Sequence, residues 1–418
     1  MSLADDTAAR RPAVAPEPAA APEPAAAPTT RVPEVHVITP GDHFSPSTGS
    51  AIPTVVDGLC AALPDVPGLA RPRVAVAEGT YADRYPSADA VLYPPARARR
   101  ADRYLDALAG RAGLPRPGAR RVLRPALGAQ QEWERSAVLV HNAPQAIGLV
   151  HPGHAAVLYA HNLLLRSYSV REAGRALDRA DALVCVSESL AEQTRPYLPP
   201  RLHSRIRVVR NGVDTTHFVP RADPARGDRL RVTFVGRMIR DKGADVVLDA
   251  VALLDRDDVE LTIVGSQGFD ATAPLSPFEQ ELHRKAAALG DRVRLRPFTA
   301  RREVAGVYRE ADVVVVASRW LEPCPLTVLE GMASGVPVVA SRIGGIPEIM
   351  QGTGVQVAPG DPADLAGALE ALADDEALRL RTGAECRTWA EAHDWRWART
   401  HLDAVLAEAA GVSPTPVG

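Results

Sequence analysis

Lysine is nearly missing from this chain of 418 residues, because only Lys242 and Lys285 stand among its 48 basic residues. Cysteine is scarce too, and the four cysteines form no C-x-x-C pair and no Cys/His cluster. Such a pattern does not support structural zinc, an iron–sulfur cluster or a disulfide framework, so we expect a reducing compartment. Since arginine supplies nearly all of the positive charge, either lysine raises the question why arginine does not stand at that position.

Long apolar runs are also absent. No stretch approaches the ~20 apolar residues of a membrane span, and the N-terminal MSLADDTAARR lacks the apolar core of a signal peptide. The net charge of −3 excludes the strong basic excess typical of nucleic-acid-binding proteins. These absences predict a cytoplasmic protein with no nucleic-acid partner. The 46% of hydrophobic residues suffices for two domains of about 150–200 residues each.

The order of segments predicts an α/β architecture. Residues 1–32, rich in proline and alanine, are expected to form a disordered tail. From Glu34 onward, uninterrupted runs of valine, isoleucine and leucine alternate with helical patterns, which predicts parallel strands buried on both faces. The expected strands are 35–39, 73–77, 90–94, 137–142, 155–162, 182–187 and 206–214 in a first series, then 231–237, 260–265, 292–298, 312–318 and 336–341 in a second. Two doubly wound Rossmann-like domains, 33–210 and 211–392, should therefore face each other across a cleft.

The segment from Glu322 to Glu330 is the strongest chemical signal in the sequence. It places one glutamate before a helix that begins near Leu326 and the other about one turn inside that helix. The first turn of such a helix exposes N–H groups that can bind phosphate. Glu330 would repel phosphate but can accept hydrogen bonds from a vicinal diol such as ribose, and Glu322 can reach sugar hydroxyls. The alternative is a pair of surface glutamates at a helix start, where acidic residues are favoured in any case.

Two cations follow the first strand of the second series, in the segment GRMIRDKG. Arg237 ends the strand and Lys242 is expected to open the next helix, so both should face the Glu322 loop. A forked guanidinium together with a compact ammonium suits a diphosphate. The alternative, an incidental basic pair at a solvated helix start, is less favoured because lysine is so rare in this chain.

The first series contributes a loop and two strand ends. The loop PGDHFSPSTGSAIP carries Gly49, where the missing side chain lets the backbone approach an anion. Two strands end in His-Asn, and a histidine there, His141 or His161, can hydrogen-bond a sugar hydroxyl or stabilise developing charge. A purely structural role is at least as common for a single histidine. Neither G-x-G-x-x-G nor G-x-x-x-x-G-K-[ST] occurs, which argues against a dinucleotide fingerprint and a P-loop.

Together these segments resemble the retaining nucleotide-sugar glycosyltransferases of family 4, which have the GT-B fold. The resemblance runs from about Glu34 to Ala410 and rests on RNGVD, GRMIRDKG, IVGS, the E-x7-E string and IGGIPE, in that order. It implies that a C-terminal helix, 393–412, crosses back to the first domain. It also implies transfer of a hexosyl or N-acetylhexosaminyl group from a nucleoside-diphosphate sugar, with UDP favoured, to a hydroxyl of a small natural product or glycan.

The same resemblance implies the site residues. Donor binding would involve Gly49, Arg237, Lys242, Leu326, Thr327 and Glu330, catalysis would involve His161, Glu322, Arg237 and Lys242, and the acceptor side would contain Ser50, His141 and His161. The two cations and the helix N-terminus would stabilise the departing diphosphate, so no metal and no further cofactor is expected. The string Asp255-Arg256-Asp257 is interpreted as a solvated turn.

Two departures from the family pattern affect this site. Thr48-Gly49-Ser50 stands where paired glycines are frequent, which narrows the access to the backbone. Cys324-Pro325 stands where Phe-Gly is frequent, and proline has no N–H to offer to a sugar hydroxyl.

Two questions stay open at the level of sequence. Nine arginines between positions 94 and 124 indicate either a patch for an anionic membrane surface or a solvated helix, and the solvated helix is favoured because no wide apolar face is evident. The competing functions are a nucleotide-sugar epimerase, a sugar phosphorylase and a non-catalytic binding module. A nicotinamide-dependent dehydrogenase is disfavoured by the missing glycine fingerprint.

Overall fold

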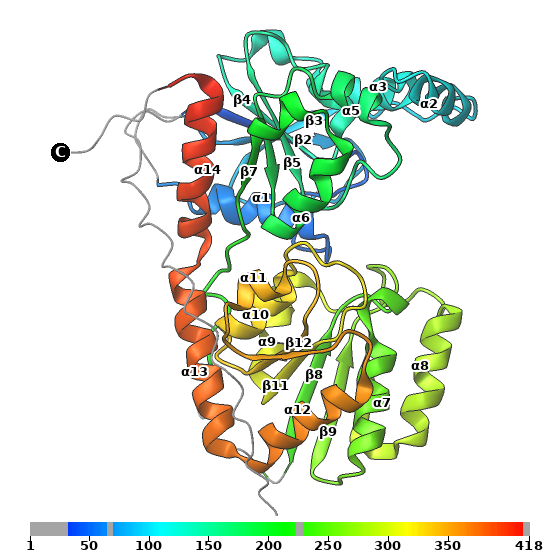
Figure 1. Cartoon of the computed structure of the whole chain (residues 1–418), viewed down its shortest axis with the longest axis vertical. Helices are drawn as coiled ribbons and strands as arrows, with labels where there is room; N and C mark the ends of the chain where they lie inside the picture. Colours follow the sequence, from blue (N-terminus) through cyan, green and yellow to red (C-terminus); the bar gives the residue numbers. More distant parts are fainter. Residues whose placement is uncertain (1–31, 65–69, 223–226, 228, 413–418) are drawn as a thin grey trace, which may run out of the picture.

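The computed structural model describes residues 32–64, 70–222, 227 and 229–412, so the tail predicted at 1–32 lies almost wholly outside the described residues. The chain forms two α/β domains arranged along its long axis (Figure 1). Each domain is built on one sheet in which every strand pair is parallel, as the uninterrupted apolar runs predict.

The first domain has a seven-stranded sheet in the order β3-β2-β1-β4-β5-β6-β7. Its strands are β1 Glu34–Val37, β2 Arg73–Ala77, β3 Asp89–Tyr93, β4 Ala137–His141, β5 Ala155–Ala160, β6 Ala182–Cys185 and β7 Ile206–Val208. Its helices are α1 Ala51–Ala61, α2 Asp102–Arg111, α3 Pro117–Leu123, α4 Pro144–Ile147, α5 Val170–Ala176 and α6 Glu188–Thr194. The expected strand at 206–214 is shorter than predicted, because the chain leaves the sheet after β7 and Val213 pairs with Asp394 instead.

The second domain has a six-stranded sheet in the order β10-β9-β8-β11-β12-β13. Its strands are β8 Leu230–Val235, β9 Val259–Val264, β10 Val293–Arg296, β11 Val313–Val316, β12 Val338–Ser341 and β13 Val355–Val357. Its helices are α7 Ala244–Leu254, α8 Pro277–Ala288, α9 Arg301–Glu310, α10 Leu326–Ala333, α11 Ile346–Met350 and α12 Pro362–Asp374. The prediction of five strands is wrong by one, because β13 has only three residues and is too short to show a pattern.

Short 3₁₀ turns connect several of these elements. They are η1 Arg124–Leu127, η2 Gln130–Glu132, η3 Arg195–Tyr197, η4 Pro200–Arg205, η5 Arg240–Lys242 and η6 Gly290–Arg292. Lys242 therefore lies in η5, just before α7, and does not open the helix itself.

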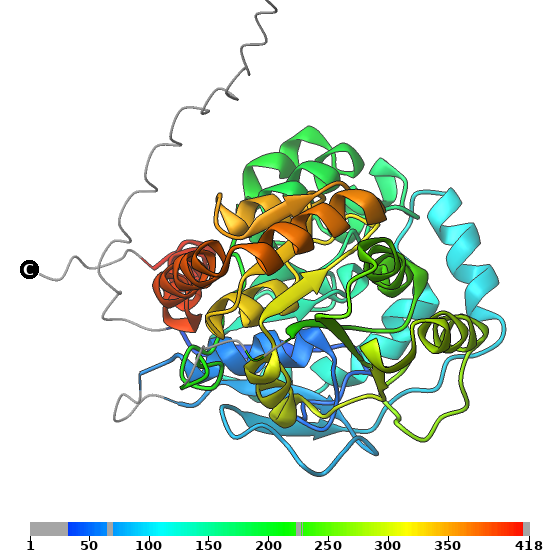
Figure 2. The same cartoon turned by 90° about the horizontal axis from the view of Figure 1, so that it is seen from below.

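The C-terminal segment returns to the first domain, as the family resemblance implies. Helix α13, Glu376–Ala392, packs on α10 of the second domain, and α14, Trp395–Ala410, packs on α1, β4 and β5 of the first. Figure 2 shows both helices nearly end-on along one side of the molecule. A buried ion pair between Arg399 of α14 and Glu34 of β1 fixes this crossing. The predicted fold is confirmed.

The two domains share apolar packing. One cluster of buried side chains extends from α1, β4, β5 and β6 of the first domain through α13 and α14 into β11, α10 and β12 of the second. Burial of apolar surface is the main favourable contribution to folding, so the crossing helices stabilise both domains together. The fold thereby holds the carboxyl ends of the two sheets opposite each other.

Candidate active site

A cleft of about 480 Å³ lies between the domains, beside the carboxyl ends of β5, β8, β9 and β11. Ligands of doubly wound sheets bind at such strand ends, and this volume suits a ligand of nucleotide-sugar size. The polar residues of the first-domain wall include Ser50, Thr54, His161, Asn162 and Asn211, whereas the second-domain wall includes Arg237, Lys242, Arg301, Glu322, Thr327 and Glu330. Every residue that the sequence predicts for the site lines this cleft, with the exception of His141.

Helix α10 points its N-terminus into the cleft. Its N-cap is Pro325, which provides no side-chain cap, and Leu326 and Thr327 of its first turn line the cleft wall. The first N–H groups of a helix have no partner within the helix, so this turn is available to an anion. The structure therefore brings together the helix end and the two cations that the sequence predicts for phosphate.

Glu322 is buried in the loop before α10 and is already satisfied by protein groups. Its Oε1 accepts a hydrogen bond from Ser318 Oγ at 2.7 Å and forms an ion pair with Lys242. The Lys242 ammonium also lies 5.8 Å from the centre of the Trp320 ring, a cation–π distance. Lys242 and Glu322 thus hold each other at the cleft, and neither carries an unbalanced charge.

Glu330 lies on the buried side of α10 with only 2% of its surface exposed. It forms an ion pair with Arg301 and accepts a hydrogen bond from the Tyr308 hydroxyl at 3.1 Å, both from α9. Although burial lowers the pKa of Arg301, the Glu330 carboxylate outweighs that effect and raises the pKa of this guanidinium above its ordinary value. Arg301 also lies 5.1 Å from the centre of the Phe218 ring.

Arg301 and Tyr308 were not predicted from the sequence. Arg301 is the first residue of α9, a position that a sequence pattern assigns to solvent. A signal does exist in the segment LTVLEGMA, because a glutamate flanked by buried apolar residues needs a cationic partner. The sequence does not show which of its many arginines fills that role.

Arg237 differs from the other charged residues of the second-domain wall. It is exposed and lines the cleft, and its side chain has no hydrogen-bond or ion-pair partner among the described residues. It is therefore the cation of this wall that is most available to a ligand phosphate.

The first-domain loop approaches the second domain closely at Gly49. A Cβ atom there would lie 3.0 Å from a ring carbon of Phe269 and 3.2 Å from one of Phe298. The neighbouring Ser50 hydroxyl donates to Asp42 Oδ1 at 2.9 Å. The loop is thus held in place by its own hydrogen bond and by two aromatic rings of the opposite domain.

The two predicted histidines have different positions. His161 lines the cleft, whereas His141 is fully buried behind it and does not reach the described cleft wall. Burial, together with the charge of His36, lowers the pKa of His161 to about 3. His161 is therefore a neutral imidazole at neutral pH.

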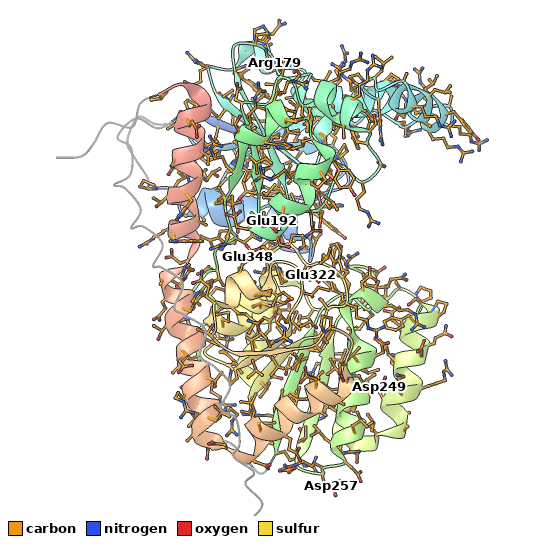
Figure 3. All side chains as sticks on the ribbon, viewed as in Figure 1. Arg179, Glu192, Asp249, Asp257, Glu322 and Glu348 are labelled. Atoms are coloured by element: carbon orange, nitrogen blue, oxygen red, sulfur yellow. The ribbon has the colours of Figure 1, made fainter. Side chains whose placement is uncertain are left out.

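Two of the remaining motifs fix loops at the boundary of the two domains. Asn211 of RNGVD donates from Nδ2 to the Cys324 carbonyl at 3.0 Å, which fixes the residue before Pro325. Glu348 of IGGIPE accepts from the Glu188 and Ser189 N–H groups at 2.8 and 2.6 Å, so it caps α6 of the opposite domain. Figure 3 labels Glu322 and Glu348 at the boundary of the two domains.

The other acidic residues of the described structure offer no metal site. Asp255 and Asp257 lie in an exposed turn after α7, and Figure 3 labels Asp257 at the end of the second domain that is remote from Glu322. Within the described ranges, no group of three or more His, Cys, Asp or Glu side chains is arranged to hold a metal ion. No helix in the part of the chain that the structure describes is long and apolar enough to cross a bilayer.

Both domains of the chain match models of known glycosyltransferase families. Residues 33–217 match the model of Glycosyltransferase Family 4, and residues 229–375 match the model of Glycosyl transferases group 1. The chain therefore belongs to glycosyltransferase family 4 and has the GT-B fold. The family predicted from the sequence is confirmed.

Several relatives share the name D-inositol 3-phosphate glycosyltransferase. The protein of Corynebacterium aurimucosum is 34% identical over 291 residues, with 64% of this chain and 67% of the relative covered. That of Corynebacterium kroppenstedtii is 32% identical over 285 residues, with 63% of each chain covered. The match spans less than two thirds of the Corynebacterium kroppenstedtii protein and only 58% of the relative from Corynebacterium efficiens.

Solved structures with the same fold cover nearly the whole chain. Anabaena HepE, in complex with UDP and glucose, superposes with a TM-score of 0.67 at 16% identity, covering 90% of this chain and 99% of HepE. Sucrose-phosphate synthase from Thermosynechococcus elongatus superposes with a TM-score of 0.62 at 20% identity, covering 89% of this chain and 97% of the synthase. At these identities the likeness shows the shared fold.

Proposed function

We propose that the chain transfers a hexosyl or N-acetylhexosaminyl group from a nucleoside-diphosphate sugar, with UDP as the favoured nucleotide, to an acceptor hydroxyl with retention of configuration. One observation carries this proposal: Arg237, Lys242 and the N-terminal turn of α10 share one wall of the cleft. Two cations and a helix N-terminus form a binding site for a diphosphate. The names of the relatives and the UDP in the HepE structure support a nucleotide-sugar donor.

The proposed catalytic role of this wall is electrostatic. As the sugar–phosphate bond breaks, negative charge develops on the leaving diphosphate, which Arg237 and Lys242 would stabilise. Lys242 needs no large movement to do so, because its ion pair with Glu322 already holds it at the cleft. In this proposal, Glu322 then binds hydroxyls of the donor sugar and Glu330 binds those of the ribose.

No residue of the cleft is well suited to be a covalent nucleophile. Both cleft carboxylates, Glu322 and Glu330, are held in ion pairs. The Cys324 thiol stays protonated, because burial raises its pKa to about 12. We therefore favour front-face substitution, in which the leaving diphosphate accepts the proton of the acceptor hydroxyl and no metal ion takes part.

The first-domain wall of the cleft, which we propose binds the acceptor, has no charged side chain among its lining residues. Its polar residues include Ser50, Thr54, His161 and Asn162. The names of the relatives given above include an inositol 3-phosphate. A buried phosphate needs a cationic partner. We therefore favour an uncharged acceptor, a small natural product or glycan, over a phosphorylated one. We also propose that the protein is located in the cytoplasm.

A thermal-shift screen with UDP-, GDP-, dTDP- and ADP-sugars tests donor binding, since a ligand that binds only the folded state raises its melting temperature. We expect UDP-sugars to raise it most. A neutral and a phosphorylated inositol, with a panel of neutral glycans, then test the acceptor, and the anomeric configuration of the product is read by NMR with and without EDTA. The proposal is wrong if no nucleotide sugar shifts the melting temperature or if the product is inverted.

The competing functions give different outcomes in the same assay. An epimerase converts the donor without an acceptor, a phosphorylase needs orthophosphate or a sugar phosphate, and a binding module shows a thermal shift without turnover. Acceptor-dependent release of the nucleoside diphosphate is the result that separates glycosyl transfer from all three.

A further inference from the structure

A line of five buried side chains leads from the crossing helix α14 to the cleft. Arg399 donates through Nη1 to both carboxylate oxygens of Glu34, at 3.0 and 2.8 Å. Glu34 Oε2 lies 3.5 Å from His36 Nε2, and His36 Nδ1 lies 2.9 Å from His141 Nε2. His141 Nδ1 in turn lies 2.8 Å from His161 Nε2. We call these five residues the histidine relay. It crosses the first-domain sheet through β1, β4 and the end of β5.

Each member of this relay is at most 8% exposed. Burial raises the pKa of Glu34, but Arg399 and His36 outweigh it and lower that pKa to about 2, so the carboxylate is ionised. Burial, and then the charges of His161 and His36, lower the pKa of His141 well below its ordinary value. A neutral imidazole has one donor nitrogen and one acceptor nitrogen. If one nitrogen of a ring accepts a hydrogen bond, the other nitrogen must therefore donate, and the reverse also holds.

The carboxylate selects that direction. In a neutral His36, a lone pair on Nε2 facing the Glu34 oxygen would be repelled, so the hydrogen lies on Nε2 and Nδ1 is the acceptor. His141 then donates from Nε2 and accepts at Nδ1, and His161 donates from its Nε2 to His141. Cys60 Sγ, 3.6 Å from His36 Nε2, is a weaker competing contact. His161 Nδ1 is left without a hydrogen in this arrangement, and it has no partner among the described residues.

We infer that Glu34, acting through His36 and His141, fixes His161 in the Nε2–H tautomer and so presents Nδ1 to the cleft as a hydrogen-bond acceptor. The catalytic consequence rests on the proposed glycosyl transfer: His161 accepts a hydrogen bond from a hydroxyl of the bound sugar or acceptor and does not donate one. Glu34, His36 and His141 are positioning residues, because they act through His161 without reaching the cleft.

The tautomers are measured directly by NMR of the full-length protein labelled with ¹⁵N-histidine, at pH 7 and without ligand. We expect both His141 and His161 to show protonated Nε2 and unprotonated Nδ1. An Nδ1–H tautomer at His161, or an even mixture of the two forms, overturns the inference. Since this measurement needs no substrate, it gives an answer even where no nucleotide sugar is turned over, and its failure is distinguishable from failure of the proposed function.

His36→Phe interrupts the relay and keeps an aromatic ring in the stack. We expect His161 to become a mixture of tautomers, kcat to fall about tenfold, as expected for one lost hydrogen bond, and KM for the donor to stay unchanged. Cys60→Ala is the control, with the wild-type tautomer and turnover within twofold. A wild-type tautomer in folded His36→Phe overturns the inference. Should that variant not fold, Glu34→Gln takes its place, and the wild-type spectrum alone still decides.

A second, independent observation concerns α2, which projects sideways from the first domain (Figure 1). Tyr104, Leu105 and Leu108 form a stripe along this helix and are 60%, 51% and 62% exposed. The helix that the sequence predicts to be solvated thus carries a narrow apolar stripe. Positions i, i+1 and i+4 share one side of a helix, so the stripe is continuous.

The charges around the stripe are of one sign. Asp102 is buried in an ion pair with Arg121, and Asp106 accepts hydrogen bonds from the backbone of α3, at 2.6 and 3.1 Å. Both acids of the segment are thus used internally, whereas Arg100, Arg103 and Arg111 are exposed.

We propose that α2 docks on an anionic lipid surface, with the Tyr104–Leu108 stripe inserted at the interface and the arginines on the headgroups. Apolar side chains gain free energy only where they leave water, which favours a membrane over a nucleic acid as the anionic partner.

Sedimentation with vesicles tests this surface. The full chain should bind vesicles of equal parts phosphatidylcholine and phosphatidylglycerol and not pure phosphatidylcholine. Leu105→Glu with Leu108→Glu should abolish binding, and Arg100→Gln should weaken it about fivefold, the effect of one surface arginine. Leu253→Glu, at a leucine of α7 that is 59% exposed, is the matched control and should bind as the wild type does. No binding to anionic vesicles, or equal loss in the control, overturns the proposal and leaves a protein partner for this face.

Discussion

Arg301 and Glu330 form an ion pair that joins α9 to α10 at the donor wall of the cleft. The side chain of Arg301 is 20% exposed and that of Glu330 only 2%, so water screens this pair little. Tyr308 completes the arrangement with a hydrogen bond to the second oxygen of Glu330. The carboxylate proposed to bind ribose is therefore held in one orientation by two residues of the neighbouring helix.

Replacing Arg301 by methionine should leave the Glu330 carboxylate buried without a cation. We expect the free energy of unfolding to fall by about 3 kcal/mol, the scale for breaking a buried ion pair, and the Kd for UDP to rise about tenfold. Chemical denaturation and calorimetric titration measure the two effects. Arg302→Met is the matched control, because the Arg302 side chain is 66% exposed and its neighbouring Glu303 pair lies on the surface. Equal effects of the two substitutions would contradict the role given to Arg301.

The two lysines provide an internal comparison. Lys242→Ala should lower kcat by about 10²–10³-fold, because it removes a preorganised cation from the leaving diphosphate. Lys285→Ala should leave turnover unchanged, because Lys285 lies on α8 with its Nζ 2.7 Å from both oxygens of Asp249, and it does not line the cleft. The comparison requires that both variants keep the wild-type circular dichroism spectrum. Wild-type turnover in folded Lys242→Ala would show that the diphosphate binds elsewhere.

Stability should fall as the pH is lowered below about 6.5. His141 and His161 have lowered pKa values in the folded state, so the unfolded chain binds protons there first. A group with a lowered folded pKa contributes stability above its unfolded pKa and loses it as the pH falls, here by at most roughly 1 kcal/mol per pH unit for each histidine. Denaturation at pH 7, 6, 5 and 4 gives the slope. His161→Gln should lower the slope of the unfolding free energy against pH by the contribution of one histidine. Substitution of the exposed His151 should leave this slope unchanged.

Sequence reasoning predicted those features that depend on local composition. The valine runs of β11 and β12 identify buried parallel strands, and the E-x7-E string identifies the helix that points into the cleft. The Arg301–Glu330 pair was not predictable, because it joins residues 29 positions apart and many arginines could fill the same role. The histidine relay was not predicted from the sequence, because His36 lies within β1, where a single histidine is usually an ordinary core residue.

Gly58 of α1 should tolerate no side chain, because α14 crosses the first domain directly above it. A Cβ atom at Gly58 would lie 2.2 Å from a ring atom of Trp395, so Gly58→Ala forces the helix and the indole apart. We expect a loss of about 1–3 kcal/mol, the usual cost of overpacking, and a lower melting temperature. Gly367→Ala on α12 is the control: Gly367 has no atom within 4 Å of its Cβ position, and alanine there should stabilise the helix by about 0.5–1 kcal/mol. If Gly58→Ala proves as harmless as Gly367→Ala, the result contradicts the packing of α14 on α1 that the structure describes.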